Sequence, residues 1–154
     1  MKILVMSDSH GSVSKLRKAF ECEQPDACIF LGDCVRDYLQ VCDEQPNVLH
    51  YVVSGNCDFG SNSGFSERII TAIGGKVFYI THGHNERVKN GYMSLCMSGL
   101  QAGADVVLFG HTHMTCVNEY EGMVLLNPGS ISSGTYGIIT IDENLKIDYY
   151  VDSL

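Results

Sequence analysis

The sequence of 154 residues predicts one α/β domain over residues 1–154, with two packed mixed sheets flanked by helices in four layers, α/β/β/α. Two observations lead to this fold class. In the N-terminal part, helix-like segments separate short apolar runs that do not alternate, which is typical of strands buried in a parallel sheet. From residue 115 on, short strands follow one another through tight turns, which favours a second sheet supplied by the C-terminal part.

The N-terminal elements alternate between strand and helix. Ser12 is expected to cap the first helix, and Pro25 ends it because proline cannot continue a helix. Gln45-Pro46-Asn47 is a typical turn before the third strand. Strands are expected over residues 2–6, 27–31 and 48–53, a helix over 13–23, and a poorly patterned helix or loop up to Cys42.

A glycine pair organises the middle of the chain. Gly74-Gly75 predicts a two-residue hairpin turn, because glycine adopts the positive φ angles that such turns need. Residues 60–64 have the composition of a flexible loop. Strands are expected over residues 66–73, 76–80, 106–109, 115–121, 123–126, 135–141 and 146–151, and a helix over 92–102.

Composition narrows the class of partner and the compartment. A net charge of −8 at pH 7 argues against nucleic acid or anionic membrane as a partner. The N-terminal apolar run is too short for a secretory signal, and no stretch approaches the length of a membrane span. The seven cysteines form no C-x-x-C pair, which is typical of a protein of the reducing cytoplasm. An exposed strand edge or apolar helix face could support a homo-oligomer.

Side chains that can bind metals follow five predicted strands, at the point where each strand ends. Open α/β sheets place their ligands at the carboxyl ends of strands. In extended chain, Asp8 and His10 leave the same side of the backbone and can point at one target. Five of the six histidines lie in these loops. The candidate ligands are Asp8, His10, Asp33, Asn56, His82, His84, His111 and His113.

Each of these motifs has a simpler explanation when it is taken alone. An aspartate at a strand end is often a helix cap, Asn56 after Gly55 is a typical turn residue, and a His-x-His pair is often solvated. Their joint occurrence after five strands favours one site for a metal such as Mn, Fe, Co, Ni or Zn. The donors are too many for one tetrahedral zinc ion, so two ions with one bridging carboxylate fit better.

The order of these motifs resembles that of a known family. The chain is similar to the calcineurin-like metallophosphoesterases, and most similar to their small single-domain bacterial and archaeal phosphodiesterases. The resemblance covers residues 1 to about 133. The motifs that carry it are Asp8-Ser9-His10, Gly32-Asp33, Gly55-Asn56-Cys57-Asp58, His82-Gly83-His84, Gly110-His111-Thr112-His113 and the later Asn127-Pro128-Gly129-Ser130.

The resemblance implies hydrolysis of a small phosphodiester at two divalent ions, often manganese, with nickel, cobalt, iron or zinc as alternatives. A hydroxide that bridges the two ions would attack phosphorus while both ions neutralise charge on the phosphate. Their four positive charges would attract an anionic substrate to an acidic chain. The implied ligands are Asp8, His10 and His113 for the first ion, Asn56, His82 and His111 for the second, and Asp33 as the bridge.

One position departs from the pattern of the larger family members. They carry a histidine after the Gly-Asn pair, where it is thought to protonate the leaving group, and this chain has Cys57. A thiol is a poorer proton donor than an imidazolium at neutral pH, so we expect hydrolysis to depend on an acidic leaving group. The expected catalytic residues are Asn56, Cys57 and His84, the last as a second-layer residue or in contact with phosphate.

Two other functions are compatible with the same motifs. A phosphomonoesterase or a cyclic-nucleotide diesterase would share the chemistry and differ only in the shape of its pocket. The retromer subunit of the same fold is a protein-interaction scaffold, so a weak or inactive scaffold is the alternative from another class. Such scaffolds tend to lose ligands, and here all seven expected ligands are present. The sequence therefore favours the phosphodiesterase.

Overall fold

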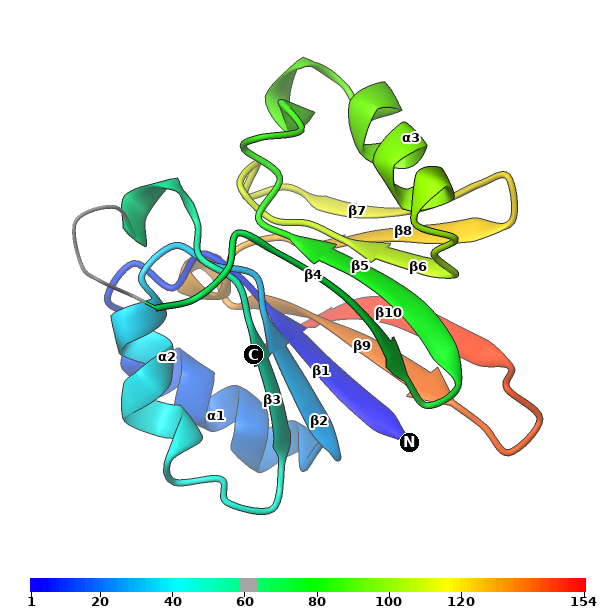
Figure 1. Ribbon diagram of the computed structural model, residues 1–154. Helices are drawn as coiled ribbons and strands as arrows, with labels where there is room; N and C mark the ends of the chain where they lie inside the picture. Colours follow the sequence, from blue (N-terminus) through cyan, green and yellow to red (C-terminus); the bar gives the residue numbers. More distant parts are fainter. Residues whose placement is uncertain (59–63) are drawn as a thin grey trace.

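The computed structural model describes residues 1–58 and 64–154, in which two five-stranded sheets face one another (Figure 1). Four residues of the predicted flexible loop, 60–63, lie outside the described residues. The first sheet has the order β10-β9-β1-β2-β3 and the second β4-β5-β6-β8-β7. Helices α1 and α2 cover the outer face of the first sheet, and α3 covers that of the second. The predicted four layers, α/β/β/α, are confirmed.

The first sheet combines both ends of the chain. β1, β2 and β3 are parallel, β9 is antiparallel to β1, and β10 is antiparallel to β9. The helices α1 and α2 follow β1 and β2. The elements are β1 (Lys2–Met6), α1 (Val13–Glu23), β2 (Ala27–Phe30), α2 (Val35–Cys42), β3 (Leu49–Val52), β9 (Thr135–Ile141) and β10 (Ile147–Ser153).

The second sheet begins with the predicted hairpin. Gly74 and Gly75 form its turn with φ angles of 57° and 80°, which suit glycine. β5, β6 and β8 are parallel, and β4 and β7 pair antiparallel at the two edges. The elements are β4 (Arg68–Ile73), β5 (Lys76–Thr81), α3 (Met93–Gln101), β6 (Val106–Leu108), β7 (Thr115–Tyr120) and β8 (Met123–Pro128).

Three sequence-based expectations about these elements were wrong. The C-terminal part does not supply the second sheet by itself, because β9 and β10 return to the first sheet and the second starts at β4. β3 is not a buried strand but an edge strand, with Leu49 55% exposed. Ser12 is the N-cap residue of α1, yet its side chain makes no capping hydrogen bond.

Three apolar clusters hold the layers together. The central cluster lies between the two sheets and includes Ile3, Val5, Ile29, Ile80 and Leu108, all fully buried. A second cluster packs α1 and α2 on the first sheet, and a third packs α3 on the second. Burial on both sides explains why β1, β2 and β6 are continuous apolar runs.

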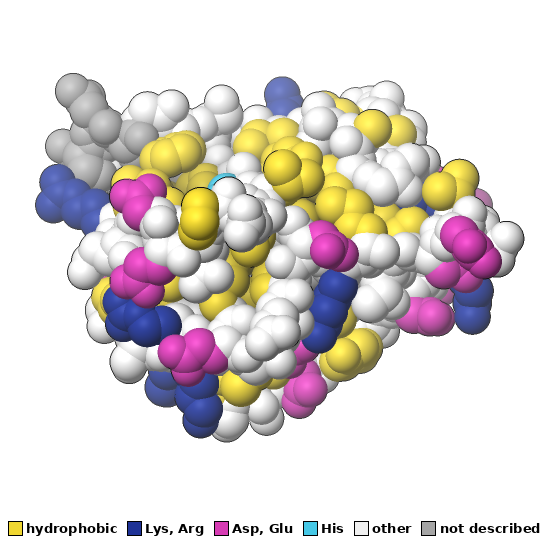
Figure 2. All heavy atoms as spheres, turned by 90° about the horizontal axis from the view of Figure 1, so that it is seen from below, with side chains coloured by type: hydrophobic (Ala, Val, Ile, Leu, Met, Phe, Trp, Pro, Cys, Tyr) yellow, Lys and Arg dark blue, Asp and Glu magenta, His cyan; other side chains and the backbone are white. Residues whose placement is uncertain are grey.

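The arrangement brings the carboxyl ends of six parallel strands, three from each sheet, to one end of the molecule. The face in Figure 2 shows scattered acidic and basic side chains among apolar ones and almost no histidine, because the histidines gather elsewhere. Within the described residues, no helix is long and apolar enough to cross a membrane.

Candidate metal centre

The candidate ligands stand in tight turns just after their strands. Five of the seven predicted ligands have positive φ angles, which non-glycine residues rarely adopt. Such a backbone costs on the order of 1 kcal/mol or more per residue and is typical of functional sites. The angles are 56° at Asp8, 41° at His10, 60° at Asp33, 66° at His111 and 58° at His113.

Asp8 and His10 do not lie on an extended strand, contrary to the prediction from the sequence. Strand β1 ends at Met6, so the two residues do not alternate along extended chain. Their side chains nevertheless meet, with His10 Nε2 3.9 Å from Asp8 Oδ1. The left-handed turn, not the strand, therefore brings them together.

One cluster of donors surrounds the buried carboxylate of Asp8. His113 Nε2 lies 3.0 Å from Asp8 Oδ1, and the Nε2 atoms of His10 and His113 are 3.4 Å apart. Asp33 joins them, since one donor atom from each of these four residues lies within 4.8 Å of the others. The spacing leaves room for a cation among them.

A second cluster shares Asp33 with the first. Donor atoms of Asp33, His82 and His111 also lie within 4.8 Å of one another. His82 Nε2 is 3.4 Å from Asp33 Oδ1 and 4.0 Å from Asp8 Oδ1. Asp33 is the one residue that belongs to both clusters, so it stands where a bridging carboxylate would be needed.

Three buried polar atoms point to a missing positive charge or proton donor. Among the described residues, Asp8 Oδ1, Asn56 Oδ1 and His82 Nε2 are buried and make no hydrogen bond. A buried polar atom without a partner costs on the order of 1–3 kcal/mol. Because these atoms belong to the two clusters or to the loop beside them, a divalent cation would satisfy them. The residues present therefore fit a metal site.

The tautomer of His82 suits metal binding. Its Nδ1 lies 2.7 Å from the carbonyl oxygen of Leu31, which can only accept, so Nδ1 carries the proton. Nε2 is then the nitrogen that faces Asp33, and it can bind a metal ion once it has lost its proton. Metal-binding histidines usually donate their other N–H to such a carbonyl, which fixes the ring.

The two imidazoles of the second cluster have opposite pKa shifts. Burial lowers the pKa of His82, but Asp33 and Asp8 raise it more, so the net direction is upward. Burial, followed by His82 and Lys89, lowers the pKa of His111 to about 4. His111 is therefore neutral at pH 7, as a metal ligand must be. Burial alone would raise the pKa of Asp33, but His82 and the N–H of Cys57 lower it overall.

Asp58 organises the turns that carry Asp33 and Asn56. Its Oδ2 accepts hydrogen bonds from the backbone N–H of Asp33 at 3.0 Å and of Gly55 at 2.8 Å. Its Oδ1 accepts another from Val35 N at 2.9 Å. Sequence reasoning placed Asp58 in a motif and gave it no role. The only indication of such a role in the sequence was the position of Asp58 at the end of the Gly-Asn-Cys-Asp motif.

Asp8 is held by residues from both sheets. Ser7 Oγ donates to Asp8 Oδ2 at 2.5 Å, and Ser130 Oγ donates to the Asp8 carbonyl at 2.8 Å. A Cβ on Gly110 would lie 2.1 Å from Ser7 Oγ, so only glycine fits there. Asn127 Nδ2 in turn donates to the Gly110 carbonyl at 2.9 Å. Sequence reasoning missed the support from Ser7 and Asn127.

The predicted catalytic residues lie beside the clusters. Asn56 and Cys57 begin the short 3-10 helix η1 (Asn56–Asp58), and Cys57 N donates to Asp33 Oδ1 at 2.8 Å. Cys57 is exposed, and partial burial together with Asp33 raises the pKa of its thiol to about 11. The ring centroid of His84 is 5.5 Å from that of His82 and 6.2 Å from that of His111.

The structure thus brings all eight predicted donors and Cys57 to one end of the molecule. The sixth histidine lies apart, where His50 Nδ1 is 2.6 Å from the Tyr38 hydroxyl. Convergence is observed, whereas the role of each residue as a ligand or catalyst stays a prediction. The fold and the site define a class of protein with two facing sheets and a carboxylate–imidazole cluster at their carboxyl ends.

Comparison with known sequences identifies the family. Residues 1–144 match the calcineurin-like phosphoesterase superfamily domain, and the chain belongs to that superfamily. It is 31% identical over 162 residues to the probable metallophosphoesterase YsnB of Bacillus subtilis, covering 99% of this chain and 91% of that protein. It is 32% identical over 161 residues to the phosphodiesterase MJ0936 of Methanocaldococcus jannaschii, covering 92% and 90%. The predicted resemblance is confirmed.

A solved structure of lower identity shares the fold. Vacuolar protein sorting 29 of Cryptosporidium parvum superposes with a TM-score of 0.75 at 20% identity, covering 99% of this chain and 97% of that one. At this identity the likeness concerns the fold alone. The layers described above are also those of solved structures of a predicted phosphoesterase and an archaeal phosphodiesterase at 28% and 29% identity.

Proposed function

We propose that this protein is a phosphodiesterase that hydrolyses a small phosphodiester with two divalent metal ions. The observation that carries the proposal is the pair of donor clusters that share Asp33. The likeness to a phosphodiesterase over most of both chains supports the choice of diester. Phosphomonoesterase activity is the nearest alternative reaction.

The chain supplies two ligand sets in this proposal. Bound there, two divalent ions would neutralise phosphate charge and activate water. Manganese is the metal we propose, with nickel, cobalt, iron and zinc accepted by the same N/O donors. The first set is Asp8, His10 and His113, the second Asn56, His82 and His111, with Asp33 between them.

The residues beside the clusters would act on the substrate. His84 is half-buried and adjoins both imidazoles of the second cluster, so its ring can orient a phosphate oxygen. Cys57 is exposed at the same edge, but a thiol with a pKa of about 11 is a weak acid at neutral pH. Departure of the leaving group therefore relies on the acidity of its own alcohol.

A catalytically weak scaffold is the competing function. Its support is the likeness to vacuolar protein sorting 29, which at 20% identity concerns the fold alone. The complete donor set and the three buried atoms without hydrogen bonds favour an enzyme. The cytoplasm stays the proposed compartment, with seven free thiols in support. A small phosphate ester as partner, the absence of nucleic-acid or membrane binding, and a homo-oligomer stay predictions.

Metal reconstitution tests the proposal. Protein from which metal has been removed with a chelator is titrated with Mn²⁺, Ni²⁺, Co²⁺, Fe²⁺ or Zn²⁺. Two quantities are measured: the rate at which bis(p-nitrophenyl) phosphate is hydrolysed and the number of metal ions bound per chain. We expect metal-dependent turnover, and loss of at least one bound ion with about 100-fold lower turnover in His111→Ala. His50→Ala is the matched control, because His50 lies outside the clusters. Metal-independent turnover, or full activity in His111→Ala, would refute the mechanism, and no turnover with any metal would favour the scaffold.

A further inference from the structure

A polar pocket adjoins the candidate metal centre. It has a volume of about 410 Å³ and is lined by Ser66, Glu67, Arg68, Thr81, Asn85 and Glu86. The residues come from the start of β4, from the end of β5 and from the loop that follows His84. Thr81 directly precedes His82, so the pocket borders the segment that carries a residue of the second donor cluster.

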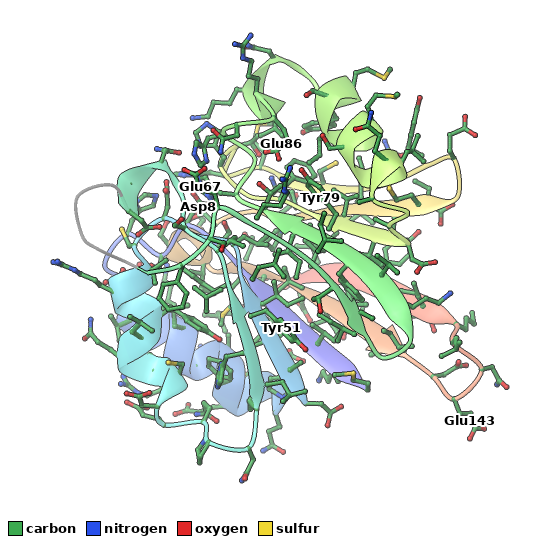
Figure 3. The ribbon with its side chains drawn as sticks, in the orientation of Figure 1. Asp8, Tyr51, Glu67, Tyr79, Glu86 and Glu143 are labelled. Carbon is green, nitrogen blue, oxygen red and sulfur yellow. The ribbon has the colours of Figure 1, made fainter. Side chains whose placement is uncertain are left out.

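Glu67 connects this pocket to the centre. Its Oε1 lies 3.8 Å from His84 Nε2, and its Oε2 accepts a hydrogen bond from Asn85 Nδ2 at 2.9 Å. Thr81 Oγ1 lies 3.3 Å from the Glu67 carbonyl oxygen. Figure 3 shows Glu67 and Asp8 at the same end of the molecule. A substrate that contacts His84 therefore meets the Glu67 carboxylate.

The pocket has an excess of negative charge. Glu86 is 7% exposed and accepts hydrogen bonds from the Tyr79 hydroxyl at 2.8 Å and from Thr81 Oγ1 at 3.1 Å, so its carboxylate is fixed. Among the described lining residues, Arg68 supplies the one cation. Two carboxylates against one guanidinium give the lining a net formal charge of −1. A second anionic group of a substrate would be repelled there.

We propose that Glu67 determines specificity by charge. It selects phosphodiesters whose second ester arm is neutral or cationic, and it rejects substrates that carry a further negative charge, including phosphomonoester dianions. The inference rests on the proposed function and names its substrate class. It follows from the position of Glu67, whose carboxylate lies 3.8 Å from His84 Nε2 and lines the pocket that would receive the second ester arm.

The expected size of the effect is modest. The Glu67 side chain is 47% exposed, so water screens its field. Two unit charges about 4 Å apart in water interact by about 1 kcal/mol, which corresponds to roughly a five-fold change in affinity. If Glu67 only orients His84, its replacement should change kcat/KM by the same factor for every substrate. The sign of the change with substrate charge therefore separates the two roles.

Three p-nitrophenyl esters with one leaving group test the proposal on Mn²⁺-loaded protein. They are the choline diester with a cationic arm, the ethyl diester with a neutral arm, and the monoester dianion. In Glu67→Gln we expect kcat/KM to fall about three- to ten-fold for the choline diester, to stay within about two-fold for the ethyl diester, and to rise about three- to ten-fold for the monoester. Glu143→Gln removes the same charge from the distant β9–β10 turn and should change none of them (Figure 3).

A binding measurement makes the test independent of turnover. Calorimetric titration of metal-loaded protein with glycerophosphocholine, a diester with a cationic arm, and with inorganic phosphate should show weaker glycerophosphocholine binding and tighter phosphate binding in Glu67→Gln. Equal changes for all ligands, or none, would overturn the proposal. If no ester is hydrolysed with any metal, the proposed function fails, and the two titrations still decide whether Glu67 selects by charge.

Discussion

The backbone N–H of His111 donates a hydrogen bond to Asp8 Oδ2 at 3.2 Å, although the two residues are 103 positions apart. Asp8 follows β1 in the first sheet, and His111 follows β6 in the second. The contact therefore joins the two sheets at the candidate metal centre. Asp8 Oδ1 makes no hydrogen bond among the described residues. Oδ2 therefore links the two sheets, and Oδ1 is available to bind a cation.

The first prediction concerns the support that Asp58 gives to this centre. Its carboxylate accepts three backbone N–H groups, so Asp58→Asn would place an amide NH₂ against donors or leave one of them unpaired. We expect a loss of about 1–3 kcal/mol in the free energy of unfolding, measured by urea denaturation. Weaker Mn²⁺ binding should accompany it, because the turn that carries Asp33 loosens.

Asp142→Asn is the matched control for this substitution. Asp142 also accepts backbone N–H groups, from Asn144 and Lys146, but in an exposed turn. We expect it to change the free energy of unfolding by less than about 1 kcal/mol and to leave metal binding unchanged. Equal losses in the two variants would show that Asp58 has no special part in the centre.

The second prediction uses the close approach at Gly55. A Cβ there would lie 2.2 Å from Asp33 Oδ1 and 2.6 Å from Asp33 N, so Gly55→Ala has to displace the shared carboxylate. We expect a destabilisation of about 1–3 kcal/mol and loss of metal binding, read by calorimetry. Gly122→Ala is the comparison for metal binding: its φ of 77° makes alanine costly there too, but a Cβ on Gly122 meets nothing within 4 Å, so metal affinity should stay unchanged. Retention of normal metal affinity in Gly55→Ala would contradict the proposed bridge.

The sequence indicated which loops lie close together, because the parallel strands of one sheet end at one edge. Asp33 follows β2 and His82 follows β5, each an apolar run that can only be a buried strand. Chain direction places each residue at the carboxyl edge of its own sheet, and the packing of the two sheets brings these edges together. The details were not predictable in this way. The left-handed turns at Asp8 and His10 depend on hydrogen bonds from distant residues such as Ser130.

Sheet membership was the least predictable part of the fold. The alternation of apolar and polar residues along β9 and β10 indicates which side chains are buried, but it does not indicate which strand lies beside them. β9 pairs with β1, more than 130 residues earlier, with Ile3 opposite Ile139. In the same way, the sequence of β3 suggests a strand in the middle of a sheet, but β3 lies at an edge. Only the order of strands in the sheet decides which strand has a single neighbour.

The third prediction is a pH dependence of stability away from the metal centre. Glu23 Oε2 lies 2.6 Å from Lys2 Nζ, and its Oε1 accepts a hydrogen bond from the Tyr136 hydroxyl at 2.7 Å. Burial raises the pKa of Glu23, but Lys2 and Tyr136 lower it more, so the net direction is downward. The contribution to stability is therefore present above the ordinary glutamate pKa of about 4.3 and is lost as pH falls through the folded value.

Glu23→Gln tests this pH dependence. We expect the variant to lose about 1 kcal/mol in the free energy of unfolding at pH 7, and the gap to the wild type to close as the pH falls below about 4. Urea denaturation at pH 7, 5 and 3.5 measures it. A gap that stays constant over this range would show that the ionised carboxylate contributes nothing beyond packing.

The last prediction concerns the leaving group. Cys57 offers a thiol, and a thiol with an ordinary pKa of about 8.5 is a weaker acid than an imidazolium for protonating a departing alkoxide. We expect kcat for a series of aryl and alkyl diesters to fall steeply as the pKa of the leaving alcohol rises. Cys57→His should flatten this dependence and accelerate the least acidic leaving groups about 10-fold or more, because general acid catalysis contributes on the order of 10²–10⁴-fold when fully developed. Cys57→Ser, which offers no better acid, should keep the steep slope. A flat slope in the wild type would mean that another residue, with His84 the nearest imidazole outside the ligand set, already protonates the leaving group.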